Sequence, residues 1–324
     1  MTSMEWMSKT TLLSICIPAY NRPLWFRRAL ASIVRGNEKY AESLEVVITD
    51  DSRSRECKEI TGELLGLWGG KCLYEHHPER LGMVGNWNRA ISLATGQYVL
   101  VVHDDDFLLQ GAIAKILECL KVVDHPVLLF GVEVVDEKER VMKRQFFKKN
   151  QCLSPPDALI QLLSNSSFVR FPAIAIARSA FTEVGMFREE WKEPCDLDMW
   201  IRLFGRYGVY CVQDVTSAYR VHSQALTMGV FNEQTIDLLL SLFVEAEQLN
   251  VLSSQEIASC KALFLYQFIL AGAWRQLKRG KLQEFRRVMD LLNIAEIKNL
   301  ACPRKWRLLR SGFSALGALI GRVG

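Results

Sequence analysis

The chain has 324 residues, of which 49% are hydrophobic and 23% charged, and a formal net charge of +4. This composition is typical of a globular protein with a large buried core, and it excludes a disordered or low-complexity chain. The nine cysteines form no CxxC pair, which favours reduced thiols. The first eleven residues lack a signal-peptide pattern, and no run of 18 apolar residues predicts a membrane span, so we expect a cytoplasmic protein.

The first half of the chain alternates apolar, β-branched segments with stretches of helical spacing. Strands are predicted at 12–20, 43–49, 71–75, 98–102 and 127–135, with helices between them. This rhythm predicts an α/β fold with a mostly parallel sheet flanked by helices. From residue 229 onward the pattern is that of long helices, so we expect one domain over 1–228 and a helical C-terminal region over 229–324.

Two of these predicted strands end in clustered carboxylates. The strand at 98–102 leads into Asp104–Asp106, and the strand at 43–49 leads into Asp50 and Asp51. Parallel strands present their carboxyl ends at one edge of a sheet, where open α/β folds bind ligands. Adjacent carboxylates repel one another unless a cation or hydrogen-bond donors gather there. We therefore predict a divalent-metal site for a phosphate-bearing ligand; the alternative for each cluster is an acidic turn that caps a helix.

Two common phosphate-binding patterns are missing. No GxGxxG follows the first predicted strand, and no GxxxxGK[ST] occurs anywhere. Dinucleotide-dependent oxidoreductases and P-loop enzymes therefore lose their main support. A nucleotide bound here would be held by carboxylates and a metal.

With these residues in view, the sequence resembles the family 2 glycosyltransferases, in particular bacterial surface-polysaccharide and O-antigen sugar transferases. The matching segments, in order, are Ser14–Asn21, Val46–Ser52, Gly82–Tyr98, Asp104–Asp106, Gly185–Phe187 and Cys195–Leu203. The resemblance covers roughly residues 12–222. It implies the GT-A (Rossmann-like) fold, with a nucleotide-sugar half over about 12–107 and an acceptor half over about 108–228.

The resemblance also implies a role for each matching residue. Asp196 would be the catalytic base that takes the proton from the acceptor hydroxyl. Asp105 would hold Mn²⁺ or Mg²⁺, and His222 is a second candidate metal ligand. The residues expected to contact the nucleotide sugar are Pro18, Tyr20, Asn21, Asp50, Asp51, Asn88 and Asp104.

The chain departs from the family pattern at three positions. His103 stands where the family often has Asp, Trp87 where many members have Arg, and Cys195 where a Glu precedes the base. His103 and Cys195 keep open a glycan-binding or scaffold module without activity. A sugar-1-phosphate nucleotidyltransferase is a further alternative, but it would need a glycine-rich basic loop, and Pro18–Arg22 is not one. Asp196 could also simply cap a helix.

Basic residues dominate the C-terminal region between Arg275 and Arg310. One face of a predicted helix there carries Trp306, Leu309, Phe313, Leu316 and Ile320. A basic amphipathic helix predicts contact of residues 303–320 with an anionic membrane surface. The alternative is a helix that packs its apolar side on the catalytic domain. No nucleic-acid recognition motif accompanies the charge, so nucleic acid is not an expected partner.

Together with these patterns, the resemblance implies a metal-dependent, inverting transferase. We expect it to move a sugar from a nucleotide diphosphate sugar, with UDP as the expected nucleotide, to a hydroxyl of a surface glycan or lipid-linked oligosaccharide. The C-terminal helix would place it on the cytoplasmic face of a membrane.

Overall fold

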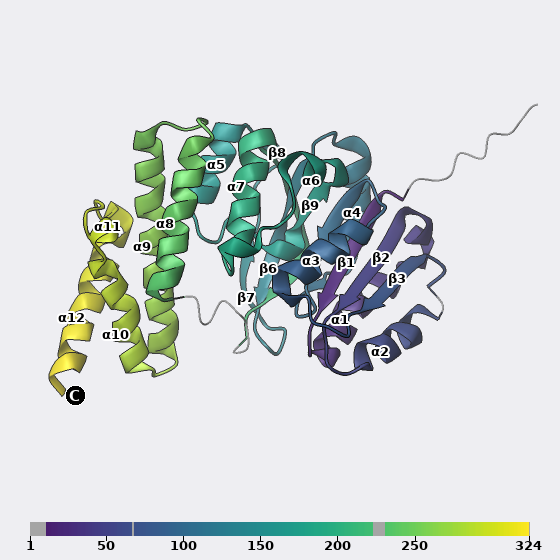
Figure 1. Cartoon of the computed structure of the whole chain (residues 1–324), viewed down its shortest axis with the longest axis horizontal. Coiled ribbons are helices and arrows are strands. Elements are labelled where there is room, and N and C mark those ends of the chain that lie inside the picture. Colours follow the sequence, from purple (N-terminus) through teal and green to yellow (C-terminus); the bar gives the residue numbers. More distant parts are fainter. Residues whose placement is uncertain (1–10, 67, 223–230, 324) are drawn as a thin grey trace, which may run out of the picture. The chain divides into compact units, whose positions relative to one another are not determined.

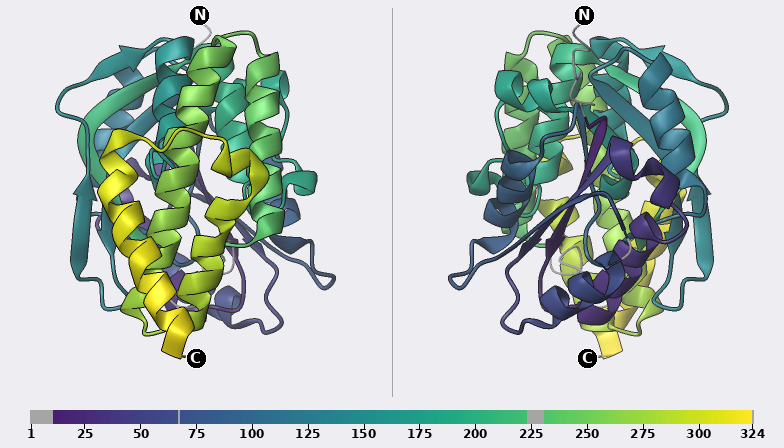
Figure 2. Two further views of the ribbon diagram at one scale, coloured as in Figure 1. Left: turned by 90° about the vertical axis from the view of Figure 1, so that its left-hand side faces the viewer. Right: turned by 90° about the vertical axis from the view of Figure 1, so that its right-hand side faces the viewer.

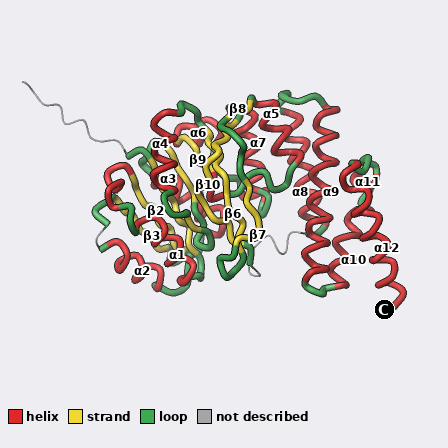
Figure 3. Tube along the Cα trace, turned by 180° about the vertical axis from the view of Figure 1, so that it is seen from behind, coloured by secondary structure: helices red, strands yellow, loops and turns green. Residues whose placement is uncertain are grey.

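The computed structural model describes residues 11–66, 68–222 and 231–323, without the side chains of 318–323 (Figures 1 and 3). Its contacts divide the chain into two compact units. The first comprises Met1–Cys152, Arg170–Glu189 and Val209–His222. The second comprises Leu153–Val169, Glu190–Gly208 and Ser223–Gly324. The second unit includes two segments from the first 228 residues, so these units are not the two predicted domains. The division into 1–228 and 229–324 stays a prediction.

The first unit is an α/β structure around one sheet. Its strands are β1 Leu13–Ala19, β2 Leu44–Asp50, β3 Lys71–His76, β4 Tyr98–Val101, β5 Phe107–Leu108, β6 Val127–Val135, β7 Val141–Gln145, β9 Ile174–Ala177 and β10 Val209–Arg220, while β8 Gln151–Leu153 ends at the unit boundary. Its helices are α1 Pro23–Val34, α2 Glu56–Leu65, α3 Gly82–Leu93, α4 Ala112–Val122 and α6 Arg178–Val184, with the short 3₁₀ helices η1 Glu38–Ser43 and η2 Phe171–Ala173.

The sheet is parallel in one half and mixed in the other. Its strand order is β3-β2-β1-β4-β9-β6-β10-β5. Strands β3, β2, β1 and β4 are parallel, whereas β9 runs antiparallel to both β4 and β6. The predicted α/β sheet with flanking helices is confirmed. The short strands β5, β7 and β8 were not predicted. Strands β5 and β8 have only two and three residues, and β7, Val141–Gln145, is largely polar, so none of them shows a clear alternation of apolar and polar residues.

The topology of the first unit fixes where a ligand belongs. From β1 the chain adds β2 and then β3 on one side, and it returns to place β4 on the other side of β1. Right-handed crossovers put α1 and α2 on one face of the sheet and α3 on the opposite face. In agreement, α1 contacts α2, and α3 packs on β1 and β2. The strand order reverses between β1 and β4, which is where open α/β sheets bind ligands.

Local sequence explains why these elements form. Every residue of β1 and of β2 is buried, as expected for central parallel strands that are covered on both faces. Pro23 begins α1, where its missing N–H costs nothing. Between them Asn21 has a φ of 54°, a left-handed conformation that asparagine tolerates better than most residues.

The second unit is helical. Its helices are α5 Pro155–Ser164, α7 Cys195–Tyr207, α8 Glu233–Gln248, α9 Ser254–Lys278, α10 Leu282–Asp290, α11 Ala295–Lys298 and α12 Arg307–Val323. The long helix α9 packs against α5, α8 and α10, and α12 packs against α10; α9, α10 and α12 lie side by side in the left panel of Figure 2. A capping box between Ser253 and Glu256 starts α9.

Within the described residues, α9 is the helix whose length and composition would suffice to cross a membrane. More than half of its apolar window, 56%, is buried inside the protein. A core helix of a soluble domain gives the same signal, so α9 is weak evidence for a membrane span.

Replacement of Gly96 by alanine should destabilise the first unit. A Cβ there would lie 2.7 Å from the backbone nitrogen of Ser14 and 2.9 Å from the carbonyl carbon of Leu13, so β1 or β4 must shift. We expect Gly96→Ala to lower the free energy of unfolding by about 1–3 kcal/mol, as overpacking does. Urea denaturation followed by circular dichroism measures the change.

Gly62→Ala is the matched control for this substitution. Gly62 lies in α2, and a Cβ there meets nothing within 4 Å. Alanine should therefore stabilise the helix by up to about 1 kcal/mol. An equal loss of stability in both variants would show that the close approach of β1 at Gly96 is not the cause.

Candidate active site

Three loops at the carboxyl ends of β1, β2 and β4 are joined by hydrogen bonds. The backbone N–H of Tyr20, after β1, donates to Asp104 Oδ2 after β4 at 2.8 Å. The N–H of Asn21 donates to Ser52 Oγ after β2, also at 2.8 Å. Asn21 Oδ1 accepts in turn from the N–H of Arg53. The β1 loop thus connects the two acidic clusters that the sequence placed on separate strands.

The two carboxylates at the end of β2 accept hydrogen bonds from the segments that follow it. Asp50 is fully buried and accepts from the N–H of Ser52 at 2.9 Å and from the hydroxyl of Tyr74 at 2.6 Å. Asp51 accepts from the N–H groups of Leu81 and Gly82 at 3.2 and 2.9 Å. These two donors open α3, so Asp51 satisfies free N–H groups at the positive end of that helix. Asp51 therefore does cap a helix, as the alternative interpretation predicted. The capped helix is α3, not α2, which is the next helix along the chain.

The acidic turn after β4 is held by two basic side chains. Arg22 Nη1 donates to Asp104 Oδ1 at 3.0 Å and to Asp105 Oδ2 at 2.9 Å. His222 Nε2 lies 2.9 Å from the same Asp105 oxygen. The structure thus brings together Asp105 and His222, the two residues predicted as metal ligands. Arg22 was not predicted at this site, because its contact with Asp104 and Asp105 depends on the pairing of β1 with β4.

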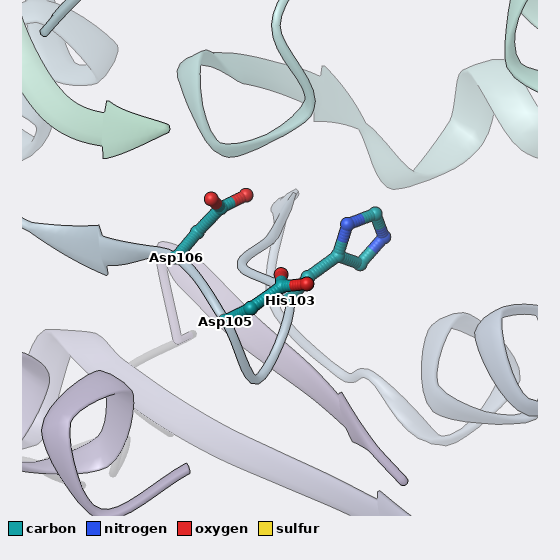
Figure 4. A group of neighbouring side chains, drawn as sticks. All are labelled: His103, Asp105 and Asp106. Atoms are coloured by element: carbon teal, nitrogen blue, oxygen red, sulfur yellow. The ribbon is translucent and has the colours of Figure 1, made fainter. Parts of the chain in front are cut away.

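Asp106 and His103 complete a group that could hold a metal ion. One imidazole nitrogen of His103 and one carboxylate oxygen each of Asp105 and Asp106 lie within 4.8 Å of one another. Figure 4 shows the three side chains extending from the same turn. Asp106 Oδ1 accepts from the N–H of Arg220 at 2.8 Å, while its buried Oδ2 has no hydrogen-bond partner among the described residues. A structural contact therefore occupies only one of the two oxygens of Asp106.

The electrostatics of this turn favour a bound cation. Burial and the charge of Asp105 raise the pKa of Asp104 to about 7, against the opposing pull of Arg22. The same two causes raise the pKa of Asp106 well above its usual value. Burial also acts to raise the pKa of Asp105, but the hydrogen bond from His222 and the charge of Arg22 hold it below its usual value. Two of the three carboxyls therefore resist ionisation, and a cation between them would remove that resistance.

The donor set fits a divalent ion. Carboxylate oxygens suit Mg²⁺ and Mn²⁺, and a neutral imidazole adds a nitrogen ligand. Burial lowers the pKa of His103 to about 4 despite the charge of Asp105, so the ring is neutral and can offer a lone pair. The buried Asp106 Oδ2, with no partner among the described residues, is an oxygen that a cation would satisfy.

Arg220 and Trp25 pack against the acidic turn and His222. Arg220 Nε donates to the carbonyl of Asp105 at 2.9 Å, and its Nη2 donates to Glu139 at the same distance. The Arg220 guanidinium also lies over the rings of Trp25 and Phe107. The Trp25 ring contacts that of His222, with centroids 4.4 Å apart. Helical spacing of Trp25 in α1 gave no signal of this role, which depends on the position of β10.

Two further residues predicted to contact the donor have structural partners. Asn88 Nδ2 donates to the carbonyl of Phe187 at 2.9 Å, and its Oδ1 accepts from the N–H of Phe187 at 3.1 Å. Asn88 thus fastens α3 to the segment after α6. Pro18 is buried within β1 and pairs with Thr49 of β2. Contacts of Pro18, Tyr20, Asn21, Asn88 and the acidic residues with a nucleotide sugar stay predictions.

The predicted base, Asp196, opens α7 in the second unit. It is half-buried, and its Oδ1 accepts from the N–H of Leu197 at 2.7 Å. The N-cap position is Pro194, so Asp196 does not cap the helix in the usual way. Asp198 is different, because it is buried and bonded through Oδ2 to Arg202, with Nη2 at 2.7 Å. Cys195 is fully buried, and burial followed by the charge of Asp196 raises the pKa of its thiol.

These features agree with a family match. The model described as Glycosyl transferase family 2 matches residues 14–185, more than half of the chain. The chain therefore belongs to glycosyl transferase family 2 and is a glycosyltransferase. A curated relative, GalNAc(5)-diNAcBac-PP-undecaprenol beta-1,3-glucosyltransferase of Campylobacter jejuni, is 25% identical over 222 residues, 67% of each chain.

Solved structures share the fold. TarS of S. aureus has a TM-score of 0.61 at 17% identity over 94% of this chain and 53% of TarS, so this chain spans about half the length of TarS. The 1–349 portion of TarS in complex with UDP also gives 0.61, over 94% and 91% of the two chains. The mannosyltransferase PcManGT from Pyrobaculum calidifontis, in complex with GDP-Man and Mn²⁺, gives 0.54 at 14% identity, over 95% and 86%. The fold is that of GT-A glycosyltransferases.

The buried pair of Asp198 and Arg202 should matter for stability. The two side chains are only 2% and 12% exposed, so Asp198→Asn leaves a largely buried guanidinium with a weaker partner. We expect a loss of about 3 kcal/mol in the free energy of unfolding. Urea denaturation measures it. Glu284→Gln, in the exposed pair with Arg287, is the control and should change stability far less. Similar losses in both variants would contradict this reading of the Asp198 pair.

Proposed function

We propose that this glycosyltransferase is metal-dependent and inverting, and that it transfers a sugar from a UDP-sugar to a hydroxyl of a lipid-linked or surface glycan. The observation that carries the proposal is the joined set of loops after β1, β2 and β4. It combines buried carboxylates and a neutral imidazole at the place where the strand order of the parallel sheet reverses, between β1 and β4.

The donor nucleotide is the first part of the proposal. Asp50, the last residue of β2, and Asp51, which follows it, would contact the base and ribose of the donor. Tyr20 supports this placement, since its ring lies under the guanidinium of Arg80, 3.9 Å from the ring centroid. A flat aromatic and cationic surface of this kind suits stacking with a nucleobase. The UDP complex of the TarS portion favours a uridine nucleotide.

The metal is the second part. Asp105, Asp106 and His103 would hold the ion, with His222 beside them, and the bound cation would neutralise charge that develops on the diphosphate leaving group. The Mn²⁺ complex of PcManGT supports this assignment. Arg22 keeps Asp104 and Asp105 in place on the β1 side of the turn.

The base is the third part. Asp196 would accept the proton of the acceptor hydroxyl as that oxygen attacks the anomeric carbon of the donor, and one such displacement inverts the anomeric centre. Its half-buried position at the start of α7 leaves the carboxylate more accessible than that of Asp198, which is 2% exposed.

Asp196→Asn tests the catalytic assignment. We expect kcat to fall by ~10²–10⁴-fold, the usual contribution of a general base. Release of UDP from a panel of UDP-sugars with Mn²⁺ gives the rate, with and without candidate lipid-linked acceptors. Binding of UDP and Mn²⁺, followed by the rise in melting temperature that a ligand causes, should stay unchanged. Loss of nucleotide binding would remove Asp196 from the role of base.

The C-terminal helix α12 supports the proposal of a lipid-linked acceptor. Phe313 is buried against Phe285 and stacks on Trp274, so part of the apolar face of α12 packs within the second unit. Leu308 and Leu309, in contrast, are 89% and 38% exposed. Exposed basic residues flank them at positions 304, 305 and 307. Exposed apolar side chains among basic ones suit the surface of an anionic membrane, where a lipid-linked acceptor would lie.

Removal of charge from this surface should weaken membrane binding. We expect Arg304→Ala combined with Lys305→Ala to lose about 2 kcal/mol of binding free energy, because each basic side chain near an anionic surface contributes about 1 kcal/mol. Co-sedimentation with phosphatidylcholine vesicles, with and without phosphatidylglycerol, measures it. Lys115→Ala combined with Lys121→Ala on α4 is the matched control. Equal binding to both kinds of vesicle by the unaltered protein would contradict the proposed surface.

A further inference from the structure

His103 occupies an unusual place in the candidate metal site. It opens the acidic turn, at a position where related transferases often carry Asp. One of its imidazole nitrogens lies within 4.8 Å of carboxylate oxygens of both Asp105 and Asp106. The resemblance to the family gives Asp105 a metal role but assigns none to His103.

Aromatic side chains hold the imidazole of His103 in place. Its ring stacks on Trp87 with centroids 4.8 Å apart and an interplanar angle of 25°, and it contacts Phe171 at 4.4 Å. Trp87 also contacts Phe171 at 4.7 Å and Phe187 at 5.4 Å, so the stacking surface is itself packed. A ring held by packed aromatic neighbours, with a nitrogen within 4.8 Å of carboxylate oxygens of Asp105 and Asp106, is pre-organised as a ligand rather than a mobile surface histidine.

A nitrogen ligand at this position changes which metal the site prefers. Mg²⁺ favours oxygen ligands in near-ideal octahedral geometry, whereas imidazole nitrogen suits first-row transition ions. We infer that His103 is a nitrogen ligand that biases this site against Mg²⁺ and towards Mn²⁺ and Co²⁺. The inference rests on the proposed metal dependence of the transferase, and it adds the residue that sets the choice of ion.

His222 is a second imidazole near the same carboxylates, and its environment is different. The side chain is fully buried, its ring contacts Trp25, and its Nε2 lies 2.9 Å from Asp105 Oδ2. The sequence predicts His222 as a metal ligand, but with Nε2 bonded to Asp105 it would instead orient that carboxylate. His222 therefore serves as the histidine against which His103 is compared.

Pulsed electron paramagnetic resonance of bound Mn²⁺ tests the assignment directly. The full chain is mixed with UDP and Mn²⁺, and the echo modulation reports any imidazole nitrogen bonded to the ion. We expect nitrogen modulation in the unaltered protein, its loss in His103→Asn and its retention in His222→Gln. Modulation that persists in His103→Asn, or that is lost equally in His222→Gln, overturns the assignment.

Metal competition tests the selectivity. Mn²⁺ affinity in the presence of UDP is measured from the signal of the free ion, and Mg²⁺ affinity is measured from its displacement of Mn²⁺. In His103→Asp the preference for Mn²⁺ over Mg²⁺ should fall by at least about tenfold. Loss of a residue that only hydrogen-bonds a metal ligand already lowers metal affinity by about that factor. This variant carries the residue that related enzymes often have, which guards against misfolding.

The two proposals fail in different ways. An unchanged preference in His103→Asp overturns the role of His103 and leaves metal dependence intact. Absence of Mn²⁺ binding by the unaltered protein with UDP overturns both.

Discussion

The accumulation of negative charge after β4 is the constraint on which the rest of the site depends. Asp104 and Asp106 are buried, and Asp105 lies between them along the chain. In water such a turn would cost little, but burial makes each ionised carboxyl expensive unless a donor or cation faces it. Arg22, His222 and the backbone of Arg220 supply that compensation from elements distant in sequence. The sheet therefore has to bring β1, β4 and β10 together before this turn can be stable.

The same constraint explains which parts of the site could be read from the sequence. Strands β1, β2 and β4 are continuous apolar runs, and the acidic residues that follow them are visible as clusters. Their convergence followed from the parallel topology alone. Arg22, Trp25 and Glu139 were missed because their contacts are made across strands whose pairing no local pattern reveals. Asp106 could not be singled out within the acidic cluster, because only the structure shows that one of its oxygens is bonded and that the other has no partner among the described residues.

The second half of the chain was harder to predict for a related reason. The helices over 233–278 follow a clear helical period, and long helices were expected from residue 229 onward. The order of the later strands did not follow from periodicity, because β9 enters the sheet antiparallel between β4 and β6. The amphipathic C-terminal helix was recognised, but its apolar face is not uniformly buried. Phe313 is buried, whereas Leu309 on the same predicted face is 38% exposed, a distinction that spacing along a helix cannot make.

The interleaving of the two units has a consequence for how the chain reaches its final state. The chain passes between the units after residues 152, 169, 189, 208 and 222. The partners of α5 and α7 include α9 and α8, and Gly205 of α7 lies so close to Leu249, which follows α8, that a Cβ would meet it at 2.6 Å. During synthesis α7 therefore emerges long before the helices that cover it. The carboxyl end of α7, at Gly205, can therefore gain its contact with Leu249 only after α8 has been made, whereas its packing on α5 is available as soon as α7 itself is complete.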